Sequence, residues 1–162
     1  MGILLQRYLN KIFDSLIAQG YRIMKNAAKN NDTMARTYNM DDAYATAVYY
    51  QGKRVRTRYL NPTPESTEIH KGWKKHHIQA GRGRGYLETF FGNFKPTTDG
   101  ISLIVVNVIY YTSILEQGKQ TPNGGRHYKI ISSISADMTE LEEKIKGSRI
   151  AGIGIKRGRT VR

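Results

Sequence analysis

The feature that most constrains the fold is a run of apolar, mostly β-branched residues from Ile101 to Ile109, with the sequence ISLIVVNVI. Val and Ile have restricted side-chain rotamers and pack well on a pleated surface. An uncharged run of this kind is typical of a strand that is buried on both faces. The next residues, 110–117, carry apolar side chains at helical spacing and are followed by Gly118, which predicts a short helix with a glycine C-cap. We therefore expect a strand at the centre of the fold that passes directly into a short helix.

Residues 2–29 have the pattern of a long amphipathic helix. Apolar side chains recur at i, i+4 and i+7 spacing from Leu5 to Ile23, and polar residues occupy the opposite face. Gly20 lies inside this helix, where glycine costs about 1 kcal/mol relative to alanine, and it could mark a bend. The pattern favours a helix that covers the core, although a long N-terminal helix is also a common place for subunits to meet.

Residues 43–60 alternate as expected for a β-hairpin around a Gln-Gly-Lys-Arg segment. Positive charge is concentrated on the tip and the second arm, at Lys53, Arg54, Arg56 and Arg58. Because residues i and i+2 project from the same face of a strand, the three arginines are predicted to form one basic row. Such a row could protect a strand edge against aggregation or contact phosphates, and both interpretations remain open.

Taken in order, these segments predict a single α+β domain over residues 1–162. We expect a small mixed or antiparallel sheet with a long β-hairpin, packed against the long N-terminal helix and a C-terminal helix. The C-terminal helix is predicted over residues 127–146, where apolar side chains recur every three or four positions. A basic hairpin and loop region is expected at about 43–95, and a basic C-terminal arm at about 147–162.

The chain is strongly basic, with 26 Lys and Arg against 13 Asp and Glu and a formal net charge of +13. Charge of this size attracts polyanions such as nucleic acid or an acidic protein, although it could also serve solubility. A glycine-arginine alternation at residues 81–85 could bring guanidinium groups to phosphates, or form a flexible loop that becomes ordered only in an assembly. We predict that the following residues contact DNA or an acidic partner: Lys53, Arg54, Arg56, Arg58, Arg82, Arg84, Lys156, Arg157 and Arg159.

Several functional classes lack the residues that they need. The chain has no cysteine, which excludes disulfides and thiolate chemistry. The adjacent His76 and His77 point apart in a strand or a helix and no carboxylate cluster accompanies them, so we expect no metal site. Neither a nucleophile elbow nor paired carboxylates are present, so we expect no enzymatic activity and no cofactor. No apolar run is long enough to span a bilayer and no signal-peptide pattern is present, so we expect cytoplasmic synthesis and no membrane partner.

The strand-to-helix unit contains a short motif formed by Val106, Asn107, Val108, Tyr110, Tyr111, Leu115, Glu116 and Gly118. With these residues the unit resembles the tailed-phage head–tail joining proteins of the HK97 gp10-like family, also described as tail-completion or neck proteins. The resemblance covers residues 1–30 and 100–146 in pattern, and residues 61–85 have no counterpart in it. After Gly118 the chain departs from the family, because Gly118-Lys119 and Gly125-Arg126-His127-Tyr128 replace a Gly-Thr and an Arg-Pro-Phe stretch.

The resemblance implies a non-enzymatic subunit of a ring in the neck of a virion, around the channel through which DNA passes. The implied partners are further copies of the chain, the portal or adaptor and tail proteins of the same virion, and DNA. The implied location is the virion, assembled in the host cytoplasm, and the implied subunit contacts are Tyr110, Tyr111, Glu116 and Gly118. Glu116 would also lie near the C-terminal end of a helix, where the dipole disfavours a carboxylate, so it is either solvated or held by a cation. The alternative function is a stand-alone basic nucleic-acid-binding protein.

Overall fold

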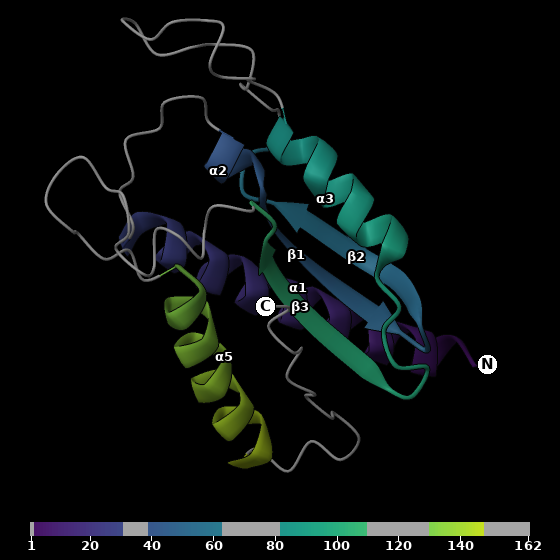
Figure 1. Ribbon diagram of the computed structural model, residues 1–162. Helices are drawn as coiled ribbons and strands as arrows, with labels where there is room; N and C mark the ends of the chain where they lie inside the picture. The colour runs from purple at the N-terminus through teal and green to yellow at the C-terminus, as the bar shows by residue number, and fades with distance from the viewer. Residues whose placement is uncertain (1, 31–38, 63–81, 110–129, 148–162) are drawn as a thin grey trace, which may run out of the picture.

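The computed structural model of the chain describes residues 2–30, 39–62, 82–109 and 130–147. They form an α+β fold in which a three-stranded antiparallel sheet packs against a long N-terminal helix and a C-terminal helix, which confirms the predicted fold class (Figure 1). The elements in chain order are α1 (Ile3–Asn30), α2 (Asn39–Asp42), β1 (Tyr44–Tyr50), β2 (Lys53–Tyr59), α3 (Arg82–Asn93), β3 (Ile101–Asn107) and α5 (Ile130–Gly147).

The central strand of the sheet is β1, which pairs antiparallel with β2 on one side and with β3 on the other. The strand expected from Ile101 is confirmed as β3, and a hydrophobic core packs on each of its faces, but it lies at an edge of the described sheet and the expectation of a central position is wrong. In β3, Ile101 and Leu103 are buried, whereas Ile104 and Val106 remain partly exposed. An apolar run can lie at a sheet edge when helices cover both faces, so its composition alone does not identify the centre. The predicted helix at residues 110–117 lies outside the described residues.

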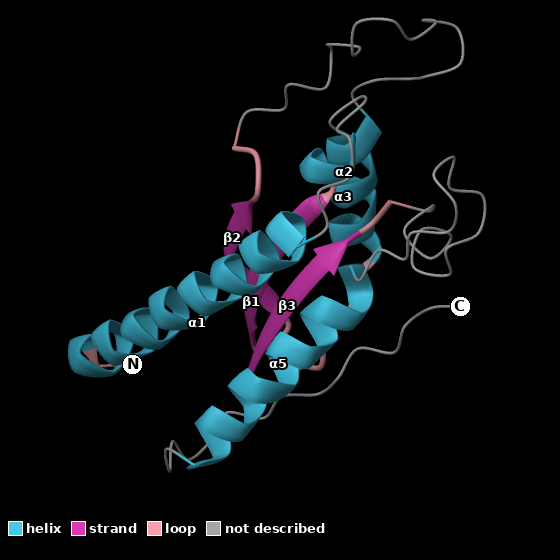
Figure 2. Ribbon diagram, turned by 90° about the vertical axis from the view of Figure 1, so that its left-hand side faces the viewer, coloured by secondary structure: helices cyan, strands magenta, loops and turns pink. Residues whose placement is uncertain are grey.

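Helices cover both faces of the sheet, as the two ribbon views show (Figures 1 and 2). Tyr44 and Val48 of β1 point into a core formed with α1 and α5. Ala45, Ala47 and Tyr49 point to the opposite face, into a second core formed with α3. The period-two alternation of a strand thus divides β1 between two hydrophobic layers, and small alanines face α3.

The hairpin between β1 and β2 turns through Gln51 and Gly52. Both residues have positive φ angles, 49° for Gln51 and 76° for Gly52, as a two-residue type I′ turn requires. Glycine adopts this conformation readily, whereas glutamine does so at some cost. The predicted hairpin is confirmed, and its tight turn is followed directly by the basic residues at the start of β2, an outer strand of the sheet as described.

Candidate functional site

The basic residues predicted from the sequence fall into a described group and a group that lies outside the described residues. Lys53, Arg54, Arg56 and Arg58 lie on β2, an outer strand of the sheet as described. Arg82 and Arg84 lie in the first turn of α3. Outside the described residues lie the predicted tail contacts Lys156, Arg157 and Arg159 and the predicted subunit contacts Tyr110, Tyr111, Glu116 and Gly118.

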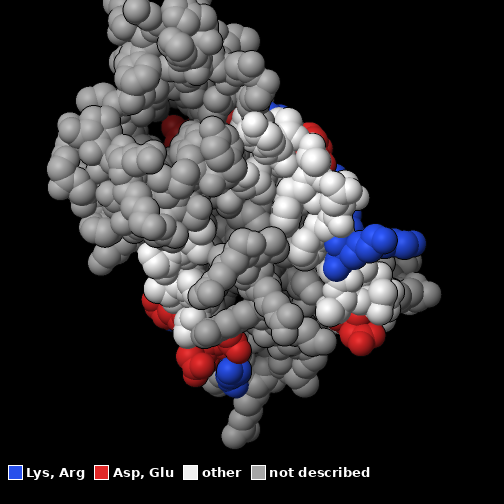
Figure 3. All heavy atoms as spheres, viewed as in Figure 1, with Lys and Arg blue, Asp and Glu red and all other residues white. Residues whose placement is uncertain are grey.

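Charges of both signs lie on each side of the molecule. Figure 3 shows acidic side chains with a basic one beside them over α5, and a basic side chain that reaches out at the right above a second acidic group. On α5, Lys144 pairs with Glu140, and Lys146 lies 2.9 Å from Glu142 and 3.6 Å from Glu143. The hydrogen bond and charge of Lys144 lower the pKa of Glu140, and the hydrogen bond and charge of Glu142 raise the pKa of Lys146.

The three β2 arginines do not form the single row that alternation predicted. The register between β1 and β2 shifts after Val48, which pairs with Arg56 while Tyr49 pairs with Arg54. Val55 is therefore an extra residue, a β-bulge, and a bulge reverses the alternation of side chains along the strand. As a result Arg54 lies over Phe91 of α3, on the opposite face from Arg56. The prediction of one basic row is wrong for Arg54.

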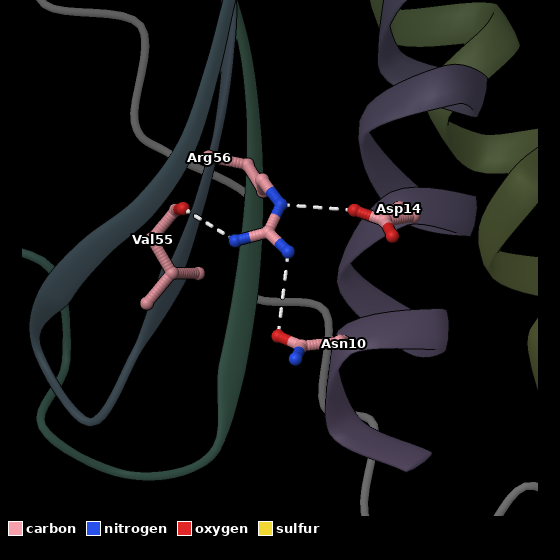
Figure 4. Close-up of polar contacts among 4 residues, drawn as sticks. All are labelled: Asn10, Asp14, Val55 and Arg56. Carbon is pink, nitrogen blue, oxygen red and sulfur yellow. Dashed lines mark hydrogen bonds and ion pairs between the residues drawn. The ribbon is translucent and has the colours of Figure 1, made fainter. Parts of the chain in front are cut away.

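Arg56 is held by α1 and by its own strand (Figure 4). Its Nε donates a hydrogen bond to Asp14 Oδ1 at 2.9 Å, and its Nη2 donates to Asn10 Oδ1 at 3.3 Å. Its Nη1 donates to the carbonyl oxygen of Val55 at 3.0 Å. Each nitrogen of the guanidinium group thus has a partner within the fold. Arg56 fastens β2 to α1 and has little capacity left for a phosphate.

Arg54 and Arg58 rest on aromatic rings but remain exposed to solvent. The Arg58 guanidinium carbon lies 3.5 Å from the ring centroid of Tyr21, and that of Arg54 lies 4.6 Å from the ring of Phe91. Both distances are in the range of cation–π contacts, which orient a guanidinium group without neutralising its charge. Together with exposed Lys53, these arginines are the β2 cations that can still reach an anion.

Arg84 makes contacts within the fold that connect α3 to the end of β2. Its guanidinium carbon lies 3.5 Å from the ring centroid of Tyr59, and its Nη2 donates to the carbonyl oxygen of Asn61. The Asn61 amide in turn donates to the buried carboxylate of Asp42 at 3.0 Å. Tyr59 donates its hydroxyl to Glu88 Oε1 at 2.9 Å, and burial, followed by this bond, raises the Tyr59 pKa. The predicted role of Arg84 in anion binding must therefore compete with these contacts.

The N-terminal end of α1 is an apolar surface that sequence reasoning missed. Ile3, Leu4, Leu5 and Tyr8 are 74%, 80%, 48% and 59% exposed, and we call these four residues the apolar end of α1. A helix of 28 residues is roughly 42 Å long at 1.5 Å per residue. Figure 2 shows this end extending beyond the strands. The sequence did contain an indication of this surface in the consecutive apolar residues 3–5. Three consecutive residues of a helix cannot all face one core, so at least one of them had to be exposed.

The described residues offer no metal centre and no membrane span. Among them, no three His, Cys, Asp or Glu side chains gather as a metal site requires, and all four histidines of the chain lie elsewhere. None of the described helices has both the length and the apolar composition to cross a membrane.

Comparison with known proteins gives no relationship from which a role could be transferred. No family model, curated protein or solved structure matches the chain.

Proposed function

We propose that the chain is a non-enzymatic structural subunit of the neck of a tailed-phage virion. Several copies would form a ring around the DNA channel, stacked between the portal or adaptor and the tail, after assembly in the host cytoplasm. The observation that carries this proposal is the apolar end of α1, Ile3, Leu4, Leu5 and Tyr8, which projects beyond the sheet. Contiguous exposed apolar side chains are typical of surfaces that bind another protein.

The order of elements supports the same proposal. The long helix α1, the strand β3 and the closing helix α5 follow one another as the resemblance implies for residues 1–30 and 100–146, and the hairpin and the helix α3 lie between α1 and β3. Two of the motif residues, Val106 and Asn107, lie at the end of β3, where Val106 packs towards the α3 core. The Asn107 side chain accepts a hydrogen bond from the backbone amide of Ile109 at 3.1 Å. This bond lies directly before residues 110–117, for which the resemblance implies a helix.

The charge of the chain suits a ring around DNA. Each copy contributes a net charge of +13, so a closed ring would concentrate positive potential around its axis. Lys53, Arg54 and Arg58 are exposed on β2 and supply cations for DNA or for the acidic surface of a neighbouring ring. Contacts to phosphates require no base recognition, which is appropriate for a channel that passes any sequence.

The test is the assembly state of the purified full-length chain. We expect light scattering to report an oligomer at high protein concentration and negative-stain images to show closed rings with a central opening. A chain that stays monomeric at all concentrations and binds duplex DNA tightly at moderate salt contradicts the proposal.

The second candidate function is a stand-alone nucleic-acid-binding protein. The observation that favours it is the exposure of Arg54 and Arg58, whose guanidinium groups are positioned on aromatic rings and remain open to solvent. This candidate requires a monomer whose affinity for nucleic acid falls steeply with salt. The assembly state therefore separates the two candidates.

A further inference from the structure

We infer that neighbouring copies contact one another head to tail, with the apolar end of α1 in one copy docked on the acidic face of α5 in a second copy. The acidic face of α5 is defined by Asp137, Glu140 and Glu143. This inference rests on the proposed ring and names the surfaces that would form it.

The apolar end of α1 needs a partner other than the core of its own chain. Leu9, Ile12 and Phe13, on the next turns of α1, pack into the core with the sheet and α5, whereas residues 2–8 are all exposed. Leu4 and Tyr8 are four residues apart and lie on one side of the helix, and Ile3 and Leu5 lie to either side of them. Its large side chains fit the buried centre of an interface, where leucine and tyrosine are displaced from water.

The charges beside the patch determine which surface can cover it. Arg7 and Lys11 flank the patch, and the first turn of α1 holds no acidic residue. The first acid along α1 is Asp14, which is engaged by Arg56. If two copies packed their α1 ends against each other, these cations would face one another, and like charges oppose such a contact. The geometry therefore disfavours a two-fold contact and requires a negatively charged partner surface.

The helix α5 supplies such a surface on the same chain. It carries Asp137, Glu140, Glu142 and Glu143 against two lysines, so it stays net negative within a strongly positive protein. Lys144 pairs with Glu140, and Lys146 pairs with Glu142 and Glu143, so the lysines offset part of this charge. Asp137, Glu140 and Glu143 are spaced three residues apart and therefore follow one side of the helix. Ala136 is exposed on this side, where its small side chain leaves room for the leucines of the apolar end.

The placement of the two surfaces makes the contact repeat. In Figure 1 the N-terminal end of α1 and the helix α5 lie on opposite sides of the view, although both helices pack against the same face of the sheet. A contact between two different surfaces leaves one surface of each kind free on the pair. Such heterologous contacts continue to a closed ring when the rotation between copies allows it.

Charge exchange on the full-length chain tests the pairing directly. The variant Arg7→Glu/Lys11→Glu places acids against the acidic face, and Glu140→Lys/Glu143→Lys places lysines against the basic flank. We expect each variant alone to raise the concentration at which oligomers form by tenfold or more in light scattering. An equimolar mixture restores opposite charges at each contact between the two variants, and the variant that carries all four changes restores them at every contact. Both are expected to assemble as the wild type does.

Two further variants control the experiment. Lys25→Glu/Lys95→Glu reverses two exposed lysines outside both surfaces and is expected to assemble normally. Leu4→Ser/Tyr8→Ser removes exposed apolar contacts while leaving the core intact, and it is expected to abolish assembly with an unchanged circular dichroism spectrum.

The outcomes separate this inference from the proposed function. If wild-type rings form and the charge variants assemble equally well, or if neither the mixture nor the fourfold variant restores assembly, the head-to-tail pairing is wrong and the ring stands. If the wild-type chain forms no oligomer, the proposed function itself is contradicted.

Discussion

At the scale of single residues, Gly20 explains how closely α1 lies against the sheet. A methyl group at Gly20 would overlap Thr46 Oγ1 and lie 3.0 Å from Leu103 Cδ1. Thr46 is fully buried in the central strand, and its hydroxyl donates a hydrogen bond to the carbonyl oxygen of Ile104 at 2.9 Å, so it cannot move freely. We therefore expect Gly20→Ala to lower the free energy of unfolding by about 1–3 kcal/mol, as overpacked sites do. Urea denaturation measures this change.

The control for this substitution is Gly85 in α3, where an added methyl group meets no atom within 4 Å. Without a clash only the helix propensity changes, so Gly85→Ala is expected to raise the free energy of unfolding by about 0.5–1 kcal/mol. A Gly20→Ala protein that is as stable as the Gly85→Ala protein would contradict the close approach of α1 to Thr46.

Tyr49 should influence how stability depends on pH. The residue is 4% exposed, and among the described residues its hydroxyl has no hydrogen-bond partner. Burial raises the pKa of its phenol, which the positive charge of Arg54 partly opposes. Because the pKa in the fold lies above the unfolded value of about 10, this contribution to stability is complete below pH 10 and is lost as the pH rises through the folded pKa.

Replacement of the buried phenol of Tyr49 and of the half-buried phenol of Tyr59 tests this expectation. Tyr49→Phe removes an unpaired hydroxyl, so we expect no loss of stability at pH 7 or a gain of up to about 1 kcal/mol, with a shallower decline above pH 10. Tyr59→Phe also flattens the alkaline decline, but it breaks the bond to Glu88 and should cost about 0.5–1.5 kcal/mol at pH 7. Unfolding free energies measured from pH 8 to 11 distinguish the two, and equal losses at pH 7 would refute the assignment.

At the scale of elements, the bulge at Val55 determines which face of the sheet each arginine of β2 occupies. Arg56 turns to α1 and pairs with Asp14, and the two side chains are 36% and 64% exposed. Solvent therefore screens the pair, and we expect a coupling energy of about 0.2–1 kcal/mol in a double-mutant cycle of Arg56→Ala and Asp14→Ala. The coupling should fall towards zero in about 1 M salt, where the screening length is near 3 Å.

A second cycle provides the control for this pair. Arg58 rests on the ring of Tyr21, so Arg58→Ala and Asp14→Ala are expected to add without coupling. A salt-sensitive coupling of the same size in both cycles would show that Asp14 senses the charge of β2 as a whole and that its bond to Arg56 has no separate effect.

The sequence predicted α1, the hairpin arms, β3 and α5, but it predicted neither how the strands pair nor the helix α3, whose first turn lies where a glycine-arginine loop was expected. The periodicities of α1, α5 and the hairpin arms are local, because each depends on which face of one segment is buried. The bulge at Val55 and the central position of β1 depend on how strands pair, and no pattern within one strand records its partner. Alanine has a low strand propensity, so Ala45 and Ala47 gave little indication of a central strand. In the fold they are buried on the face of β1 that packs against α3.

At the scale of the whole molecule, the apolar end of α1 was missed because a pattern within one segment does not record what that segment packs against. The pattern of residues 2–29 correctly predicted a long helix but gave no length for the sheet beneath it. A seven-residue strand spans roughly 23 Å, about half the length of α1, so the first turns of the helix lie beyond the sheet. The basic surface was predicted in part, since Lys53, Arg54 and Arg58 are exposed, whereas Arg56 and Arg84 have partners within the fold.

The two interpretations of the basic strand predict different salt dependence for DNA binding. Each cation that neutralises a phosphate of duplex DNA contributes about 0.9 to the slope of log K against log salt. We expect Lys53→Ala/Arg54→Ala/Arg58→Ala to reduce this slope by about 2–3 in fluorescence anisotropy titrations of a short duplex. Arg56→Ala should leave the slope almost unchanged, because its guanidinium group is held by Asp14 and Asn10.

If the basic residues instead protect the strand edge, the opposite results are expected for the same variants. If the cations serve only to keep β2 from pairing with strands of other molecules, the triple variant retains the DNA slope and instead aggregates. The relevant property would then be the positive charge along the outer edge of the described sheet. Lys53 places this charge beside the hairpin turn, and Arg58 places it near the far end of β2. If the triple variant remains soluble and loses salt-sensitive DNA binding, the β2 cations contact phosphates. Aggregation and DNA binding can both be measured on one preparation of the variant.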